Sequence, residues 1–147
     1  MKKYWVMKTF QDWWATFQQS SIIGIDENGV DQNYLELTRD EVDNLYDDAN
    51  LNFNDYQNRV FKEFCKWMQI DDFVIIGTGQ TTAFNISGIV RVTGDYHFDS
   101  TIKPRHIRSV ELLRVFEAPL PMQRFIRTPR LELIDEEDFH EAIISLI

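Results

Sequence analysis

The sequence offers little material for covalent cross-links or metal clusters. It contains one cysteine, Cys65, and three histidines among its 147 residues. A single thiol excludes an internal disulfide and any zinc site built from several cysteines of the chain. Cys65 lies within residues 61–67, whose half-apolar, helical pattern favours a buried structural thiol.

Long hydrophobic runs are also missing. No stretch approaches the roughly 20 apolar residues of a membrane span, and the N-terminus lacks the apolar core and cleavage site of a signal peptide. We therefore expect a cytoplasmic protein with no membrane segment. With 44% hydrophobic residues, the 147-residue chain suffices for one domain with a proper core and is too short for two.

Catalytic signatures are absent from the sequence as well. It contains no H-E-x-x-H, G-x-S-x-G or P-loop motif. Asp95, His97, Asp99 and His106 form the best group for metal binding or proton transfer, but capping of turns in their loop explains them better. We expect no metal site, no cofactor and no catalysis in this chain, so any catalysis belongs to a separate domain or partner.

Basic residues are scarce overall, with 15 Lys and Arg against 24 Asp and Glu and a formal charge of -9. This balance argues against a simple nucleic-acid-binding protein, whose surface is usually basic. The distribution is uneven, however. Residues 24–73 contain 13 acidic and 4 basic side chains, and residues 131–147 contain 6 acidic side chains and no Lys or Arg. Residues 103–130 reverse the balance, with 7 basic against 2 acidic side chains, and form a basic block.

Short apolar strands and amphipathic helices follow one another along the chain. Alternating aromatic and β-branched residues predict strands, and apolar residues at i, i+3 and i+4 predict helices. The connection between residues 73–77 and 83–93 is too short for a crossover, so this pair is expected to be antiparallel. Strands are expected near residues 3–8, 21–25, 73–77, 83–93 and 108–116. Helices are expected near residues 10–19, 39–46 (capped by Thr38 with Glu41), 56–68 (capped by Asp55) and 135–147.

These elements predict an α+β fold. We expect a curved, partly closed mixed β-barrel of about five to six strands, covered by two or three helices, in a single domain spanning residues 1–147. Residues 1–116 would form its core, followed by a basic extended segment at 117–130 and the helix at 135–147. Because that helix is apolar and has no C-cap, we interpret the chain as the N-terminal recognition part of a larger protein.

Aromatic side chains are concentrated in residues 10–19. Phe10, Trp13, Trp14 and Phe17 recur at i, i+3, i+4 and i+7, the spacing of one helix face. Packing on the sheet explains most of these rings. Two adjacent tryptophans cannot both point inward from one helix, so at least one is expected to stay partly exposed, which suggests a use in binding.

Three stretches, in register, resemble a known family. Residues 4–9, YWVMKT, are similar to the YWL-x-KS strand that opens EVE domains. Residues 14–25 give the second match, and residues 73–113 the third, with a G-T-G turn, a G-D-Y tripeptide and the pattern H-x-R-x-V-x-x-L. Together they cover roughly residues 1–116. They resemble the EVE/PUA-like domains, relatives of the YTH domains, found at the N-termini of some McrB-type modification-dependent restriction proteins.

The resemblance implies a pocket for a base that has been flipped out of its stack. Its walls would come from the end of the first strand, the segment after the first helix, the Gly77-Thr78 turn and the G-D-Y loop. Asp26 would read the edge of the base, while Tyr96 and one tryptophan would stack on its faces. Where McrB-type relatives often have a tryptophan, this chain has Ile25 and Asp26. The pocket residues so implied are Lys8, Thr9, Trp13, Trp14, Ile25, Asp26, Thr78 and Tyr96.

The basic block is predicted to contact the nucleic-acid backbone. Lysine and arginine side chains neutralise phosphates whatever the base sequence. Some of these arginines could instead pair with acidic residues in the segment 40–55. The residues expected to border one groove are Lys103, Arg105, His106, Arg108, Arg124 and Arg127.

Four classes of function remain open at this point. The resemblance favours recognition of a flipped modified base in DNA, by a targeting domain or subunit of a restriction or other defence system whose catalytic nuclease or NTPase is a separate domain or partner. A PUA-like RNA-binding module would use the same pocket. A protein-interaction or regulatory domain would use the acidic half of the chain, and an enzyme would use the aspartate and histidine group.

Overall fold

The computed structural model describes residues 2–78, 85–121 and 130–147. Its strands form one mixed sheet in the order β2, β6, β4, β3, β1, β7, and a short strand, β5, pairs with β6. β1 and β3 are parallel to each other, and the remaining pairings of the described strands are antiparallel. The strands are β1 (Tyr4–Lys8), β2 (Ile22–Ile25), β3 (Phe73–Thr78), β4 (Asn85–Val92), β5 (His97–Phe98), β6 (His106–Pro121) and β7 (Leu131–Ile134).

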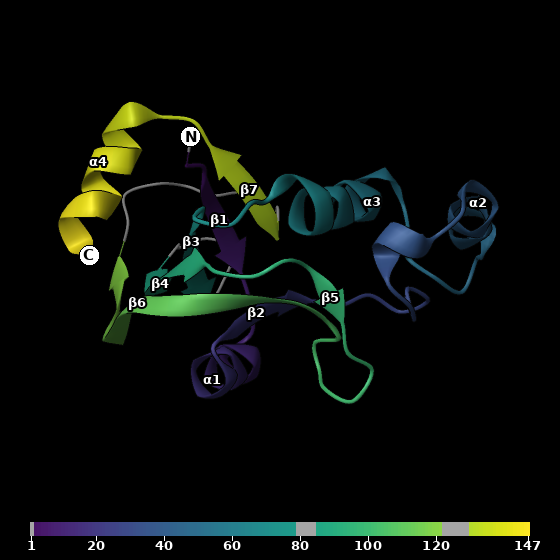
Figure 1. Ribbon diagram of the computed structural model, residues 1–147, viewed down its shortest axis with the longest axis horizontal. Helices are drawn as coiled ribbons and strands as arrows, with labels where there is room; N and C mark the ends of the chain where they lie inside the picture. The colour runs from purple at the N-terminus through teal and green to yellow at the C-terminus, as the bar shows by residue number, and fades with distance from the viewer. Residues whose placement is uncertain (1, 79–84, 122–129) are drawn as a thin grey trace.

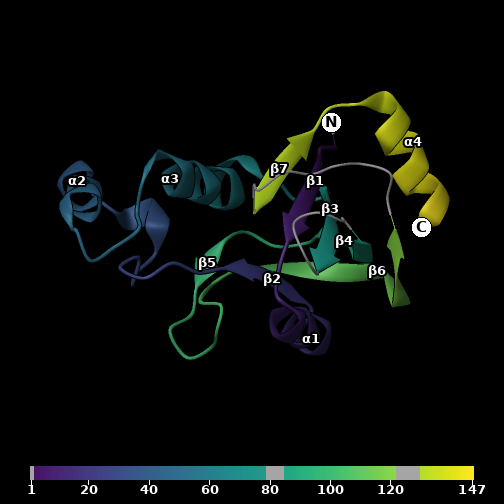
Figure 2. The ribbon, with the colours of Figure 1, turned by 180° about the vertical axis from the view of Figure 1, so that it is seen from behind.

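Helices lie on both sides and at both ends of this sheet (Figure 1, Figure 2). In Figure 1, α1 lies below β2 and β6 and α3 lies above them, while α2 and α4 stand at opposite ends of the molecule. The α+β half-barrel predicted from the sequence is confirmed, and the described part contains an α-helix at each of the four places where one was expected. The helices are α1 (Gln11–Ser20), α2 (Arg39–Asp47), α3 (Asp55–Lys62) and α4 (Glu137–Leu146), with a 3-10 turn, η1 (Tyr34–Glu36), and a π-helical turn, η2 (Glu63–Trp67).

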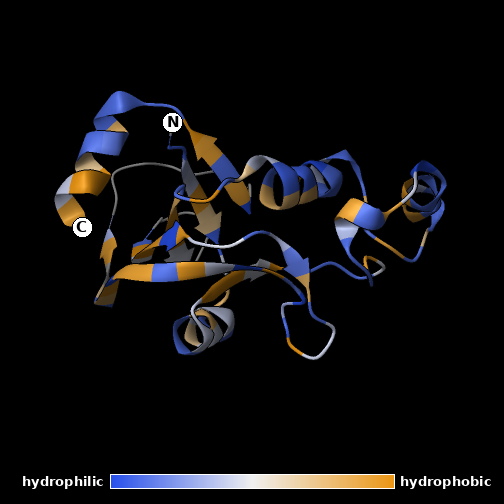
Figure 3. Ribbon diagram, viewed as in Figure 1, coloured by the Kyte–Doolittle hydropathy of each residue, from blue (hydrophilic) through white to orange (hydrophobic). Residues whose placement is uncertain are grey.

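The strand β1 is buried on both faces because the sheet has a core on each side. Alternate residues of a strand point to opposite faces. Trp5 and Met7 accordingly join a hydrophobic cluster that includes residues of α1, α3 and η2. Tyr4 and Val6 join a second cluster, which α4 covers with Phe139 and other apolar residues. Figure 3 shows the contrast with α2, which is mostly hydrophilic and contributes Leu45 alone to the buried residues of the first cluster.

The two tryptophans of α1 differ in burial, as expected for neighbours on one helix. Trp14 is buried and Trp13 is half-buried. Gly88 of β4 explains how close the helix lies to the sheet, since a Cβ atom there would meet the ring of Trp14 at 2.4 Å. The indole of Trp14 therefore packs directly on the backbone of β4.

The predicted N-cap of α2 is confirmed, and the N-cap of α3 lies one residue earlier than predicted. The side chain of Thr38 and that of Glu41 form the predicted capping box of α2. The cap of α3 is Asn54, whose side chain accepts a hydrogen bond from the amide of Gln57 at 3.0 Å, and not Asp55. Asn and Asp cap helices about equally well, so the sequence alone did not separate these two neighbours.

The strands at the end of the chain differ more from expectation. β6 begins at His106 and runs to Pro121, beyond the predicted range 108–116, because its first residues pair with β2 and its later residues pair with β4. β7, which was not predicted, pairs with β1. The predicted antiparallel pair of β3 and β4 is present.

Three further features of the described residues bear on function. No helix among them is long and apolar enough to cross a membrane. No group of three or more His, Cys, Asp and Glu side chains among them is arranged to hold a metal ion. Cys65 is buried, and burial raises the pKa of its thiol. The side chain therefore packs in the core as a neutral thiol and is a poor nucleophile.

Candidate nucleic-acid interface

The ends of β1, β2 and β3 come together on one side of the sheet. The amide of Thr9 donates to the carbonyl of Gly77 (2.9 Å), and the amide of Lys8 donates to the carbonyl of Arg130 (2.8 Å). The Arg130 guanidinium in turn donates to the backbone carbonyl of Asp26 (2.9 Å). Three of the segments that the resemblance places around a pocket are therefore neighbours in the structure.

Thr9 brings a polar group without a partner to this junction. Its hydroxyl oxygen is buried and has no hydrogen-bond partner within the described part of the chain. An unpaired buried hydroxyl costs about 1–3 kcal/mol, and native proteins pair the large majority of such groups. The hydroxyl of Thr78, by contrast, is paired with that of Ser87 at 2.5 Å. The hydroxyl of Thr9, unlike that of Thr78, is therefore available for a hydrogen bond with a ligand.

Two aromatic rings follow Thr9 in the chain. Phe10, at the N-cap position of α1, is 67% exposed, and its ring meets that of Trp13 edge to face with a centroid distance of 5.2 Å. Exposing so large a ring to water is unfavourable, whereas a base stacked on an aromatic ring contributes about 1–3 kcal/mol. The sequence prediction included Trp13 and missed Phe10. The signal available for Phe10 was its place between a strand and the first turn of a helix.

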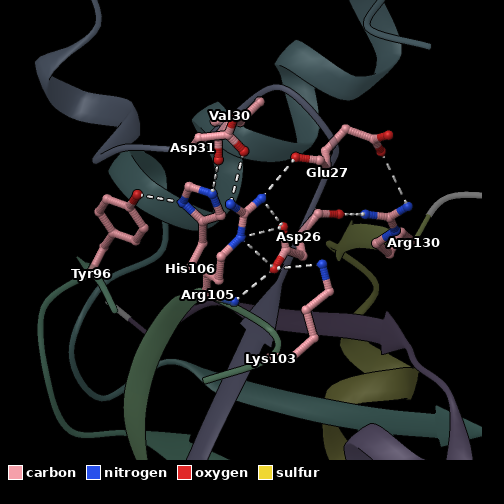
Figure 4. A network of polar contacts seen from close by, with 9 residues as sticks. All are labelled: Asp26, Glu27, Val30, Asp31, Tyr96, Lys103, Arg105, His106 and Arg130. Carbon is pink, nitrogen blue, oxygen red and sulfur yellow. Dashed lines mark hydrogen bonds and ion pairs between the residues drawn. The ribbon is translucent and has the colours of Figure 1, made fainter. Parts of the chain in front are cut away.

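Asp26 has a structural role that was not predicted (Figure 4). Its carboxylate is buried and accepts hydrogen bonds from the amide of Arg105 (2.9 Å) and from its guanidinium (2.8 Å at the shortest), and it pairs with the ammonium group of Lys103 (3.2 Å). Burial by itself raises the pKa of Asp26, but these interactions outweigh it and hold the pKa below its ordinary value. Both oxygens are occupied, so Asp26 fixes residues 103–105 to the end of β2 and has no free acceptor for a base, contrary to the prediction.

Carboxylates neutralise most of the cations around this network. Arg105 also pairs with Asp31 at 2.8 Å, and the Arg130 guanidinium lies 3.7 Å from the carboxylate of Glu27. The hydrogen bonds that Arg105 donates to Asp26 are the main cause of its raised pKa, and those to Asp31 add to it. Lys103 keeps 59% of its side chain exposed. Lys103 pairs with Asp26 but remains accessible as a predicted phosphate contact, while Arg105 is held by two carboxylates and is mostly covered.

Arg108 is buried, contrary to the prediction that it contacts phosphates. Its guanidinium donates to three backbone carbonyls, those of Gly94 (3.1 Å), Phe64 (3.2 Å) and Met68 (2.5 Å). Two of these carbonyls lie at the end of the helical segment formed by α3 and η2. Because the last carbonyls of a helix lack partners within it, Arg108 completes the hydrogen bonding of that end.

His106 is also buried, so its predicted contact with a phosphate is not possible in this structure. One ring nitrogen is 2.7 Å from the hydroxyl of Tyr96, and the other is 2.8 Å from the carbonyl of Val30. Burial lowers the pKa of His106. A neutral imidazole that donates to Val30 and accepts from Tyr96 satisfies both contacts.

The predicted pocket residues do not all meet. Lys8, Thr9, Asp26 and Thr78 lie at or beside the strand ends. Trp14 and Ile25 are buried in the core. Tyr96 is buried and separated from Asp26 by Arg105 and His106, as Figure 4 shows. The predicted stacking pair of Tyr96 with Trp13 or Trp14 is therefore not assembled, and Arg124 and Arg127 lie outside the described residues.

The fold is an α+β fold like that of YTH domains, and the predicted resemblance to YTH-related domains is confirmed at the level of fold. The chain belongs to the family described as Domain of unknown function (DUF8426), whose model matches residues 10–133. No curated protein sequence matches it.

Solved structures resemble the chain over nearly its whole length. A hypothetical protein from Leishmania major has a TM-score of 0.56 and 11% sequence identity, with 99% of this chain and 94% of that chain covered. The YTH domain of the Zygosaccharomyces rouxii MRB1 protein, in complex with N6-methyladenosine RNA, has a TM-score of 0.54 and 11% identity, with 99% and 86% covered. Human THYN1, in complex with DNA containing 5-methylcytosine, has a TM-score of 0.49 and 13% identity, with 99% and 97% covered.

Proposed function

We propose that this protein binds a modified base, flipped out of DNA, where the ends of β1, β2 and β3 meet. The observation that carries the proposal is the unpaired, buried hydroxyl of Thr9, followed in the chain by the exposed ring of Phe10. A flipped base needs an aromatic surface for its face and a few polar groups for its edge. Phe10 and Trp13 supply the first, and Thr9 supplies the second.

Positive charge near the junction supports binding of an anionic strand. Lys8 is the last residue of β1, and the exposed side chain of Lys103 reaches the end of β2 through Asp26. Burial lowers the pKa of Lys8, while the nearby charge of Glu132 opposes this shift. Charged contacts of this kind position a backbone without reading its sequence, so selectivity has to arise at Thr9 and the aromatic pair.

RNA is the second candidate ligand. The observation in its favour is the fold shared with the YTH domain of Zygosaccharomyces rouxii MRB1, which was solved with N6-methyladenosine RNA. DNA is favoured by the sequence resemblance to the N-termini of McrB-type proteins. The same resemblance underlies our further proposals that the domain targets a restriction or defence system and that a separate nuclease or NTPase supplies catalysis.

Binding titrations test the proposal directly. DNA duplexes with and without N6-methyladenine or 5-methylcytosine, and matched RNA strands, are titrated by fluorescence anisotropy. We expect one modified ligand to bind more tightly than its unmodified partner, and Phe10→Ala to weaken that ligand about tenfold, in line with the loss of a stacking contact. Ile144→Ala is the matched control, because Ile144 is 56% exposed on α4, away from the strand ends.

Two outcomes would count against the proposal. Equal affinities for every modified and unmodified pair would show that the protein does not recognise the modification. Equal losses of affinity in Phe10→Ala and Ile144→Ala would show that the ligand does not bind at this junction. A preference for the modified RNA over the modified DNA would select the second candidate ligand.

A further inference from the structure

A second feature of the surface, unrelated to the strand ends, lies where η1, α2 and η2 meet. A groove of about 320 Å³ there is lined by Leu35, Leu37, Val42, Lys62, Lys66 and Trp67, together with Tyr34. An adjoining hollow of about 590 Å³ shares Leu35 and Lys66 with it and includes Ile70, and Asp95 and Arg108 also line it. The two hollows form one continuous surface. We call it the Trp67 face and define it by Leu35, Lys62, Lys66, Trp67 and Ile70.

Three large apolar side chains of this face are exposed to solvent. Leu35 is 52%, Trp67 is 47% and Ile70 is 48% exposed. Single apolar residues on a surface are ordinary, but neighbouring ones rimmed by polar groups mark sites of interaction with other macromolecules. Tryptophan, moreover, is enriched among the residues that contribute most to protein–protein binding.

The backbone holds Trp67 in this position. Its segment is a π-helical turn, closed by a hydrogen bond from the amide of Met68 to the carbonyl of Glu63 at 2.8 Å. The Arg108 guanidinium also donates to the carbonyl of Met68. Turns of this kind are rare and frequently occur at functional sites. The exposed ring is thus presented by a fixed turn rather than by a fraying helix end.

The charge of the Trp67 face contrasts with its surroundings. Residues 24–73 hold 13 acidic and 4 basic side chains. Two of those four, Lys62 and Lys66, lie one helical turn apart on this face, and neither forms an ion pair with another described residue. Arg59, one turn earlier, pairs with Glu63 instead. The face is therefore apolar with two available positive charges.

We propose that the Trp67 face binds a short segment of a partner protein that carries large apolar side chains flanked by Asp or Glu. The carboxylates would pair with Lys62 and Lys66, while the apolar side chains would enter the hollows beside Trp67. Leu35 and Ile70 are aliphatic and give no stacking surface for bases, which disfavours a nucleic acid strand. A second copy of this chain is also disfavoured, because a two-fold pairing of this face brings like charges together.

The test uses short synthetic peptides in which Leu and Glu positions are permuted, titrated into the ¹⁵N-labelled protein. We expect peptides that combine both residue types to shift the indole NH signal of Trp67, assigned with Trp67→Phe, and to leave that of the buried Trp5 unchanged. Trp67→Ala and Lys62→Glu/Lys66→Glu should each weaken the best peptide at least about tenfold, as expected for central interface residues. Leu133→Ala, a 45% exposed leucine on β7, is the matched control.

Charge reversal gives the sharpest check. A peptide whose Glu residues are replaced by Lys should bind Lys62→Glu/Lys66→Glu better than it binds the natural protein. Because both lysines are exposed, this variant should keep its fold even if Trp67→Ala does not. The proposal is overturned if no peptide binds, if peptides with and without Glu bind equally, or if unmodified oligothymidine or oligoadenosine shifts the Trp67 signal in preference to every peptide.

Discussion

Thr9 and Thr78 lie at the ends of neighbouring strands and differ in whether their hydroxyls are paired. We predict that Thr9→Val raises the free energy of unfolding by about 1 kcal/mol, because it removes an unpaired buried hydroxyl, and weakens binding of the modified ligand. Thr78→Val should instead lower the free energy of unfolding by about 1–2 kcal/mol, since it leaves Ser87 unpaired. Urea unfolding and ligand titration of both variants measure the two effects. A Thr9→Val protein with unchanged affinity would refute the role of its hydroxyl.

Two residues of the basic block are expected to respond oppositely to substitution. Lys103→Ala should reduce the slope of log affinity against log salt by about one unit, because an exposed cation that contacts a phosphate releases about one counterion. Arg108→Met should leave that slope unchanged and lower the free energy of unfolding by about 3 kcal/mol, because the buried carbonyls at the helix end lose their hydrogen-bond donor. Titrations at several salt concentrations, together with urea unfolding, distinguish the two roles. Equal salt slopes for Lys103→Ala and the natural protein would contradict the assignment of Lys103.

The buried roles of Asp26, His106 and Arg108 could not be predicted from local sequence. Asp26 and Arg105 are 79 residues apart, and Arg108 is 40 residues from Met68. Basic residues in a row indicate an accessible surface when nothing local pairs with them, and here their partners come from distant segments. The strand ends around Thr9 were predicted because a family pattern, rather than local chemistry, placed them.

At the scale of elements, the packing of α1 on the sheet depends on the absence of a side chain at Gly88. Gly88→Ala would place a methyl group 2.4 Å from the Trp14 ring and 2.9 Å from the carbonyl of Arg114. We predict a loss of about 1–3 kcal/mol from this overpacking. Combining it with Trp14→Leu should recover part of the loss. Urea unfolding of the single and double variants checks this, and additive losses in the double variant would contradict the direct contact.

Elements with strong local patterns were predicted well, and elements made by pairing were not. Apolar runs in the sequence predicted the buried strands β1, β3 and β4, and a capping box predicted α2. The four residues of β7 have no such run, and pairing with β1 makes them a strand. Likewise, β6 extends beyond its predicted end because β4 provides a partner as far as Pro121.

At the scale of the whole molecule, His106 links stability to pH. Its pKa is lowered in the folded protein, so the unfolded chain takes up a proton first as the pH falls. The stabilisation is complete above the pKa of an unfolded histidine, about 6.5, and is lost as the pH falls from there toward the folded value. The lowered pKa of Asp26 adds a further loss at pH values below about 4.

We therefore expect a lower free energy of unfolding at about pH 5 than at about pH 7.5. His106→Gln should reduce stability at both values and flatten the difference between them. His97→Gln, on the exposed strand β5, serves as the control and should keep the difference. Urea unfolding curves at the two pH values give the comparison. If the free energy of unfolding of His106→Gln differs between the two pH values as much as that of the natural protein, His106 is not the cause of the pH dependence.

The position of β1 inside the sheet also governs when the domain can assemble during synthesis. β1 lies between β3, which begins only at Phe73, and β7, which begins at Leu131. While the first half of the chain is being translated, Tyr4, Trp5, Val6 and Met7 have neither neighbouring strand to pair with, and such long-range pairings form slowly. We therefore expect the nascent protein to expose an edge of this apolar strand until β7 has left the ribosome, and to be most prone to aggregation during that interval.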